Sequence, residues 1–168
     1  ELKRCFGISD TLLNAETAND IYESGKQLLQ TEAFRARELL KSMNVKLVCT
    51  TDDPVDDLSH HRKLAEDQSF DIKVLPAFRP DKAMAVETPA AFNQWVDQLE
   101  GSAETNIVDF ESFLAALQQR HDFFHRRGCR LSDHGLEQPY AENFSAADIA
   151  RIFEDVRSGK TVGQAEIR

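Results

Sequence analysis

Three stretches of the sequence place polar, charged or imidazole side chains directly after a short apolar run. A carboxylate or an imidazole at a strand end can act as a general acid or base, or sit near a metal ion. A guanidinium can bind both oxygens of a carboxylate or phosphate at once. The side chains in question are Thr51, Asp52, Asp53, Arg79, Asp81, Asp133 and His134. Gly135 follows the last two and can adopt a positive φ, so this junction indicates a functional site.

Each junction also has a purely structural interpretation. The 133–135 segment could be a plain β-turn, since Asp and Gly are ordinary turn residues and His134 would then be exposed. Arg79 could form an internal ion pair with Asp81, or with Asp52 or Asp53 on the neighbouring strand. We expect one of Asp52 and Asp53 to cap the helix that follows them.

Other residues that could carry chemistry have structural interpretations. His121 and His125 share a helix face and are similar to a zinc-protease helix, but Asp122 stands where that motif has glutamate. His121 also lies on the apolar stripe, so we predict a core histidine rather than a metal ligand. His60 and His61 lie on a polar helix, and we predict that both are solvated.

Composition limits the class of partner. With 29 acidic against 20 basic residues, the net charge of −9 argues against binding to nucleic acid or to an anionic membrane surface. The longest apolar run, 113–117, is too short to span a bilayer. The first residues show no charged-then-apolar pattern, so we expect no secretory signal. Cys5, Cys49 and Cys129 have no metal or redox spacing, and we expect buried, reduced thiols in a cytoplasmic protein.

Hydrophobic periodicity supplies the elements that would hold these side chains. Strands are predicted near 46–51, 72–78 and 129–133, and helices over 15–30, 32–43, 56–67, 88–99, 109–128 and 145–159. The first two strands flank a short helix as in a βαβ unit, which makes them parallel. Asp109 and Ser145 are predicted helix caps. The stripe expected to face inward on the 109–128 helix is Phe110, Phe113, Leu114, Leu117, His121 and Phe124.

The predicted domain organisation is a helical region over 1–44 followed by an α/β region over 45–168. Three parallel strands cannot close a barrel, which takes about eight. The α/β region is therefore either a section of a barrel or a set of strands that pair with something else. In both cases we expect 51–53, 79–82 and 133–135 to meet on one rim of a parallel sheet.

Three motifs together resemble the uronate isomerases (glucuronate isomerases) of the amidohydrolase superfamily. They are Cys49-Thr-Thr-Asp-Asp-Pro54, Val74-Leu-Pro-Ala-Phe-Arg-Pro-Asp-Lys82 and Gly128-Cys-Arg-Leu-Ser-Asp-His-Gly135, in the family's order and at similar spacing. The resemblance extends over nearly the whole chain. It implies a distorted (β/α)8 barrel with an additional helical region, of which this chain would be an internal fragment. The implied fold is α/β, a partial (β/α)8 barrel section with three parallel strands and a large helical portion.

The resemblance also implies an activity. The full-length protein would interconvert D-glucuronate with D-fructuronate, and D-galacturonate with D-tagaturonate. Arg79 matches the family's motif arginine and would contact the substrate, and Asp133 matches a carboxylate that ends a central barrel strand and would be catalytic. The family binds a divalent metal, usually zinc, through a His-x-His pair and a later aspartate, and no His-x-His occurs in this sequence. We therefore expect no metal ligand and no activity in the fragment alone.

The residue types suit that chemistry. Moving a carbonyl from C1 to C2 of a hexuronate needs a proton acceptor, an electrophile for the enediolate and an anchor for the C6 carboxylate. Two other functions stay open: a metal-dependent hydrolase of the same superfamily, and a stand-alone helical binding module. The expected partner is a small hexuronate, and exposed strand edges would also allow a homo-oligomer.

Overall fold

The computed structural model describes residues 2–136, 140 and 142–167, and its contacts divide the chain into two compact units. One unit comprises the chain up to Lys46 together with Ser69–Ile72. The other comprises Leu47–Gln68 and the chain from Lys73 onward, and it contains all the predicted site residues. None of the helices in the described ranges is long and apolar enough to cross a membrane.

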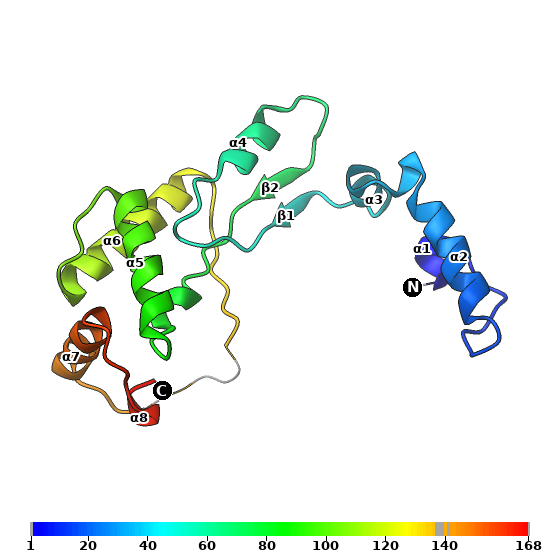
Figure 1. The fold of residues 1–168 in the computed structure, drawn as a ribbon. Helices are drawn as coiled ribbons and strands as arrows, with labels where there is room; N and C mark the ends of the chain where they lie inside the picture. The colour runs from blue at the N-terminus through cyan, green and yellow to red at the C-terminus, as the bar shows by residue number, and fades with distance from the viewer. Residues whose placement is uncertain (1, 137–139, 141, 168) are drawn as a thin grey trace. The chain divides into compact units, whose positions relative to one another are not determined.

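The first unit is helical, and its first two helices appear in blue in Figure 1. Its elements are α1 (Leu2–Phe6), α2 (Ala18–Leu29), the 3₁₀ turn η1 (Glu32–Phe34) and α3 (Ala36–Ser42). The predicted helix over 32–43 is interrupted because Arg35 has extended backbone, with φ −66° and ψ 150°. The short helix α1 was not predicted, and it packs through Phe6, whose ring stacks on Phe34 at 5.6 Å between centroids.

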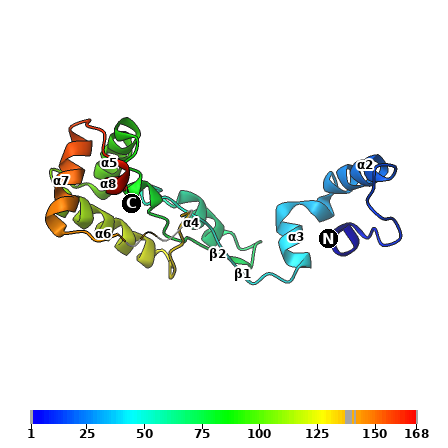
Figure 2. The same ribbon diagram turned by 90° about the horizontal axis from the view of Figure 1, so that it is seen from below.

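The second unit contains the sheet and the helices that support it. Its elements are β1 (Leu47–Cys49), α4 (Ser59–Glu66), β2 (Lys73–Leu75), the 3₁₀ turn η2 (Asp81–Met84), α5 (Pro89–Ala103), α6 (Phe110–Arg126), α7 (Ala146–Arg157) and α8 (Gln164–Ile167). Within this unit, α5 packs against both α6 and α7, as the two perpendicular views show (Figures 1 and 2).

The parallel pairing of the first two strands is confirmed. β1 and β2 pair in parallel, with Val48 opposite Val74. The pairing is shorter than predicted because the Asp52 side chain takes the N–H of Ala77 at 3.1 Å, which a regular ladder would direct to a backbone carbonyl. It resumes as a single parallel bridge between Asp52 and Phe78.

The predicted third strand over 129–133 is wrong as a strand. Among the described residues, this segment makes one parallel bridge, between Ser132 and Phe78, and Phe78 donates its N–H to the carbonyl of Leu131 at 3.1 Å. The bridge still places the segment beside the end of β2. The α/β class is therefore shown, with two parallel strands in a mostly helical chain.

The main core lies between α5, α6 and α7. The inner face predicted for α5 is confirmed, and its members are buried with residues of the two neighbouring helices: Phe92, Trp95, Val96, Leu99, Ala103, Ile107, Phe113, Ala116, Phe153 and Val156. The stripe predicted for α6 is partly wrong, because Leu114 and His121 are exposed. The buried face of α6 instead includes Arg120, a polar residue that the pattern excluded.

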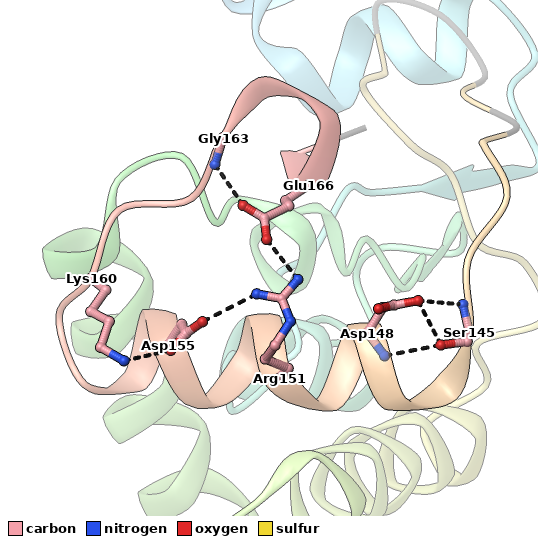
Figure 3. A network of polar contacts seen from close by, with 7 residues as sticks. All are labelled: Ser145, Asp148, Arg151, Asp155, Lys160, Gly163 and Glu166. Carbon is pink, nitrogen blue, oxygen red and sulfur yellow. Dashed lines mark hydrogen bonds and ion pairs between the residues drawn. The ribbon is translucent and has the colours of Figure 1, made fainter.

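The predicted helix caps are confirmed. Asp109 and Ser112 form a reciprocal capping box at the start of α6, and Ser145 and Asp148 form another at the start of α7 (Figure 3). Figure 3 also shows Arg151, which binds Glu166 at 2.7 Å and thereby ties α8 to α7.

The prediction of buried cysteines is wrong for Cys49. Cys129 is buried and Cys5 is half-buried, but Cys49 is exposed. Successive side chains on a strand point to opposite faces, and in β1 only Val48 lies on the partly covered face.

A buried guanidinium joins the helices to the loop that follows β1. Arg120 is 7% exposed and donates from Nε to the carbonyl of Pro54 at 2.7 Å, from Nη2 to Asp56 at 2.8 Å and from Nη1 to Ser102 at 2.9 Å. Its guanidinium carbon also lies 4.2 Å from the ring centroid of Phe123. One side chain thus satisfies three backbone carbonyls from two separate segments.

Replacing Arg120 should therefore destabilise the chain strongly. An Arg120→Met variant keeps the apolar stem but leaves buried carbonyl groups without donors, so we expect the free energy of unfolding to fall by about 3 kcal/mol or more. Urea unfolding followed by circular dichroism measures the change. Arg126→Met, at an exposed position of the same helix, is the control and should cost less than about 0.5 kcal/mol. Equal losses in the two variants would contradict the role given to Arg120.

Candidate functional site

The site begins where the backbone brings Phe78 and Ser132 together in a parallel bridge. The next residues along, Arg79 and Asp133, pair through their side chains. Arg79 donates from Nε to Oδ1 of Asp133 at 3.2 Å and from Nη2 to Oδ2 at 2.5 Å. The two side chains are 37% and 38% exposed, and the hydrogen bond to Asp133 raises the pKa of the guanidinium. This two-point pairing was not among the ion pairs considered from the sequence.

Asp81, in the first turn of η2, holds the segment that follows Asp133. Its Oδ1 accepts a hydrogen bond from Nδ1 of His134 at 2.9 Å, and its Oδ2 accepts one from the N–H of Gly135 at 2.7 Å. Oδ2 also lies 3.9 Å from Nε of Arg79. Burial raises the pKa of the Asp81 carboxyl, but these hydrogen bonds and the nearby positive charge outweigh it and hold the pKa below its ordinary value.

The glycine at position 135 fits this close approach. A Cβ atom placed on Gly135 would lie 3.2 Å from Oδ2 of Asp81, which is tighter than most real Cβ contacts. The missing side chain therefore lets the backbone N–H reach the carboxylate. We call Arg79, Asp81, Asp133 and His134 the rim cluster.

The carboxylate of Asp53 is held by three neighbouring groups. Its Oδ1 accepts from the indole N–H of Trp95 at 2.9 Å and from the N–H of Val55 at 3.1 Å. Its Oδ2 forms an ion pair with Nζ of Lys82 at 3.0 Å. The carboxylate therefore connects the loop after β1 to α5 and η2.

Asp52 lies deeper than its neighbours. Its side chain is 10% exposed, and Oδ2 accepts from the hydroxyl of Thr50 at 2.6 Å and from the N–H of Ala77 at 3.1 Å. Thr51 beside it is exposed. The prediction that Asp52 or Asp53 caps the next helix is wrong, because the N–H of Ser59 at the start of α4 is bound by the side chain of Asp57 instead.

The prediction that His61 is solvated is also wrong. Its side chain is 12% exposed, and its Nε2 lies 2.7 Å from Oγ1 of Thr50, whereas His60 is exposed as predicted. The spacing of Leu58, His61 and Leu64 at intervals of three could have shown that His61 shares the inner face of α4.

The rim cluster combines groups that bind anions with groups that move protons. Of the predicted site residues, the structure brings Arg79, Asp81, Asp133 and His134 into direct contact, and Asp52 adjoins them through its carbonyl, which accepts the N–H of Arg79 at 3.0 Å. The described residues include no group of three or more His, Cys, Asp or Glu side chains that could hold a metal ion. The arrangement suits binding of an anionic ligand and acid–base chemistry.

The hydrogen bond from the N–H of Gly135 to the Asp81 carboxylate should weaken when the carboxylate is protonated in acid. Because the folded pKa of Asp81 lies below its ordinary value of 3.8, the ionised carboxylate contributes stability above 3.8 that is lost as the pH falls through the lower folded value. We expect the amide resonance of Gly135, followed by ¹H–¹⁵N NMR from about pH 7 to about pH 2, to shift with a midpoint below 3.8. The transition should vanish in Asp81→Asn, and a midpoint above 3.8 would contradict the assignment.

Comparison with known proteins finds a family model that matches the whole chain. Residues 1–168 match the family model for glucuronate isomerase. Two curated relatives, both named uronate isomerase, come from Cellvibrio japonicus and Bacteroides thetaiotaomicron and are 47% and 46% identical to it over 167 residues. Each alignment covers 99% of this chain but only 36% and 35% of the relatives, so the chain spans about a third of their length.

A solved structure also matches nearly the whole chain. The uronate isomerase of Thermotoga maritima matches with a TM-score of 0.81 and 34% identity, over 99% of this chain and 36% of that one. The similarity thus includes the helical unit as well as the unit that carries the rim cluster. Because the family model matches the chain from end to end, the chain belongs to the glucuronate isomerase family.

Proposed function

We propose that the protein carrying this chain is a hexuronate isomerase, which interconverts D-glucuronate with D-fructuronate and D-galacturonate with D-tagaturonate. The observation that carries the proposal is the family match over the whole chain, together with relatives named uronate isomerase. The rim cluster supports it, since the reaction needs both an anion anchor and a group that accepts a proton.

Arg79 is proposed to bind the carboxylate of the substrate. A guanidinium has five N–H donors, and within the described residues Asp133 takes two of them. The remaining N–H groups can donate to a second carboxylate while Asp133 holds the guanidinium in place. The side chain is 37% exposed, so a small ligand can reach it.

Asp133 is proposed to be the catalytic carboxylate at this rim. An aldose–ketose conversion removes a proton from C2 and returns it at C1, and a carboxylate at a strand end can carry that proton. Asp81 and His134 order the segment behind it. Thr51, Asp52 and Asp53 are proposed to form the supporting rim, with Asp52 and Asp53 acting mainly through the internal bonds described above.

The family resemblance implies a divalent metal, proposed to be zinc, in the full-length protein. The described residues of this chain do not fit such a site, because they assemble no group of three ligands. We therefore assign none of them as a metal ligand. We also propose that β1, β2 and the segment at Ser132 are parts of a (β/α)8 barrel, and that the enzyme acts on a free hexuronate in the cytoplasm.

Substituting Arg79 tests the function and the site together. In the full-length protein, Arg79→Ala should lower kcat/KM for D-glucuronate by about a hundredfold, mainly through KM, because the substrate carboxylate loses a charge-assisted fork. Arg79→Lys keeps the charge but not the two-point geometry, and should lose about tenfold. Formation of the ketose is followed by ¹H NMR.

The control for this experiment is Arg62→Ala, at an exposed position of α4, which should keep normal turnover. Unchanged turnover in Arg79→Ala would remove Arg79 from the site. A wild-type protein that cleaves simple esters or amides but forms no ketose would overturn the isomerase assignment.

A further inference from the structure

A series of hydrogen bonds runs from His61 on α4 to Ala77, which lies shortly after β2. His61 Nε2 lies 2.7 Å from Oγ1 of Thr50, Thr50 donates its hydroxyl to Oδ2 of Asp52 at 2.6 Å, and the same oxygen accepts the N–H of Ala77 at 3.1 Å. The side chains of His61 and Asp52 are 12% and 10% exposed. Nothing in the proposed reaction uses these groups directly.

The direction of each hydrogen bond follows from the chemistry of the groups. A hydroxyl has one proton, and the Thr50 hydroxyl lies 2.6 Å from a carboxylate oxygen that can only accept. Thr50 must then accept from His61, so Nε2 of His61 carries a hydrogen. The other ring nitrogen, Nδ1, is buried and has no hydrogen-bond partner among the described residues. A bare lone pair there avoids a buried, unpaired N–H, which favours the same tautomer.

The last hydrogen bond of this series is to the backbone segment that carries Arg79. Asp52 binds the segment 77–79 three times: its N–H donates to the carbonyl of Ala77 at 3.1 Å, its carboxylate accepts the N–H of Ala77, and its carbonyl accepts the N–H of Arg79 at 3.0 Å. The carboxylate bond takes the place of a backbone-to-backbone bond of the regular ladder. Two of these bonds join backbone groups, and the Asp52 carboxylate supplies the third, so the orientation of this side chain contributes to the position of the backbone that carries Arg79.

We propose that His61 is a positioning residue for Arg79: its Nε2–H fixes the Thr50 hydroxyl, which fixes the Asp52 carboxylate, which helps to hold the backbone of residues 77–79. The role rests on the proposed function, because Arg79 is the group that would anchor the substrate carboxylate. His61 itself touches no substrate. Its loss should displace the anchor and weaken substrate binding more than it slows the chemical step.

Two amide substitutions of His61 separate this role from general stability. The amide nitrogen of glutamine reaches about as far as Nε2 of histidine, whereas that of asparagine reaches only about as far as Nδ1. In the full-length protein, His61→Asn should raise KM for D-glucuronate about tenfold and change kcat by less than about twofold, and His61→Gln should restore KM to within about twofold of wild type. His60→Asn, at the exposed neighbouring position, is the matched control and should leave both constants unchanged.

Thr50→Val tests the middle of this series of hydrogen bonds. It should reproduce the KM of His61→Asn, and the double variant should be no worse than either single one, because both remove the same connection. Wild-type turnover with an unchanged KM in His61→Asn would overturn the positioning role alone, as would equal KM values for the Asn and Gln variants. Absence of any ketose from the wild type would overturn the proposed function instead.

A spectroscopic measurement covers the case in which a His61 variant does not fold. In the wild-type full-length protein labelled with ¹⁵N-histidine, two-bond ¹H–¹⁵N correlations identify which ring nitrogen of His61 carries the proton. Protonation at Nε2 with a bare Nδ1 is the expected pattern. A proton on Nδ1 with a bare Nε2 would overturn the proposal, because His61 could not then donate to Thr50.

Discussion

The rest of the second unit depends on the hydrogen bonds that the buried guanidinium of Arg120 makes. The guanidinium donates to backbone carbonyls in the loop after β1 and near the end of α5. Burial lowers the pKa of Arg120, and the charges of Asp56 and Asp57 oppose that shift. A buried cation without a direct carboxylate partner persists only where its donors are well satisfied. The same bonds fix the loop that begins directly after Asp52 and Asp53, so the helical core and the strand ends cannot move independently.

Phe78 connects the helical core to the rim cluster. Its backbone bridges Asp52 on one side and Ser132 on the other, and its ring packs edge-on against Phe124 of α6 at 5.2 Å between centroids. Because the pairing is parallel, the next residue of each segment emerges on the same side, which is why Arg79 meets Asp133. The reactive groups are themselves partly exposed, whereas the backbone that holds them is anchored in a buried apolar cluster. This separation lets the site be polar and accessible without weakening the core.

Local sequence patterns correctly predicted the features that depend on residue type and spacing within a short stretch of sequence. The caps at Asp109 and Ser145, the inner face of α5 and the parallel pairing of the first two strands all followed from spacing and residue type. The buried position of Arg120 did not, because its carbonyl partners lie 18 to 66 residues away and no local pattern reveals them. The half-buried position of His61 could have been inferred from the three-residue spacing on α4, which the prediction of a solvated helix face overlooked. The predicted third strand was wrong because its apolar residues suit a strand, whereas its pairing within the described residues is a single parallel bridge with Phe78.

The charge balance of the rim cluster constrains how it could hold an anion. The cluster contains one guanidinium and one imidazole against the carboxylates of Asp81 and Asp133. Net charge therefore does not attract a carboxylate to this rim, and the overall charge of −9 does not help. Binding has to come from directed N–H bonds on the open edge of Arg79, whose orientation Asp133 already fixes. An arginine held in this way loses little rotamer entropy when the ligand arrives, so its pairing with Asp133 preorganises the anchor as well as neutralising it.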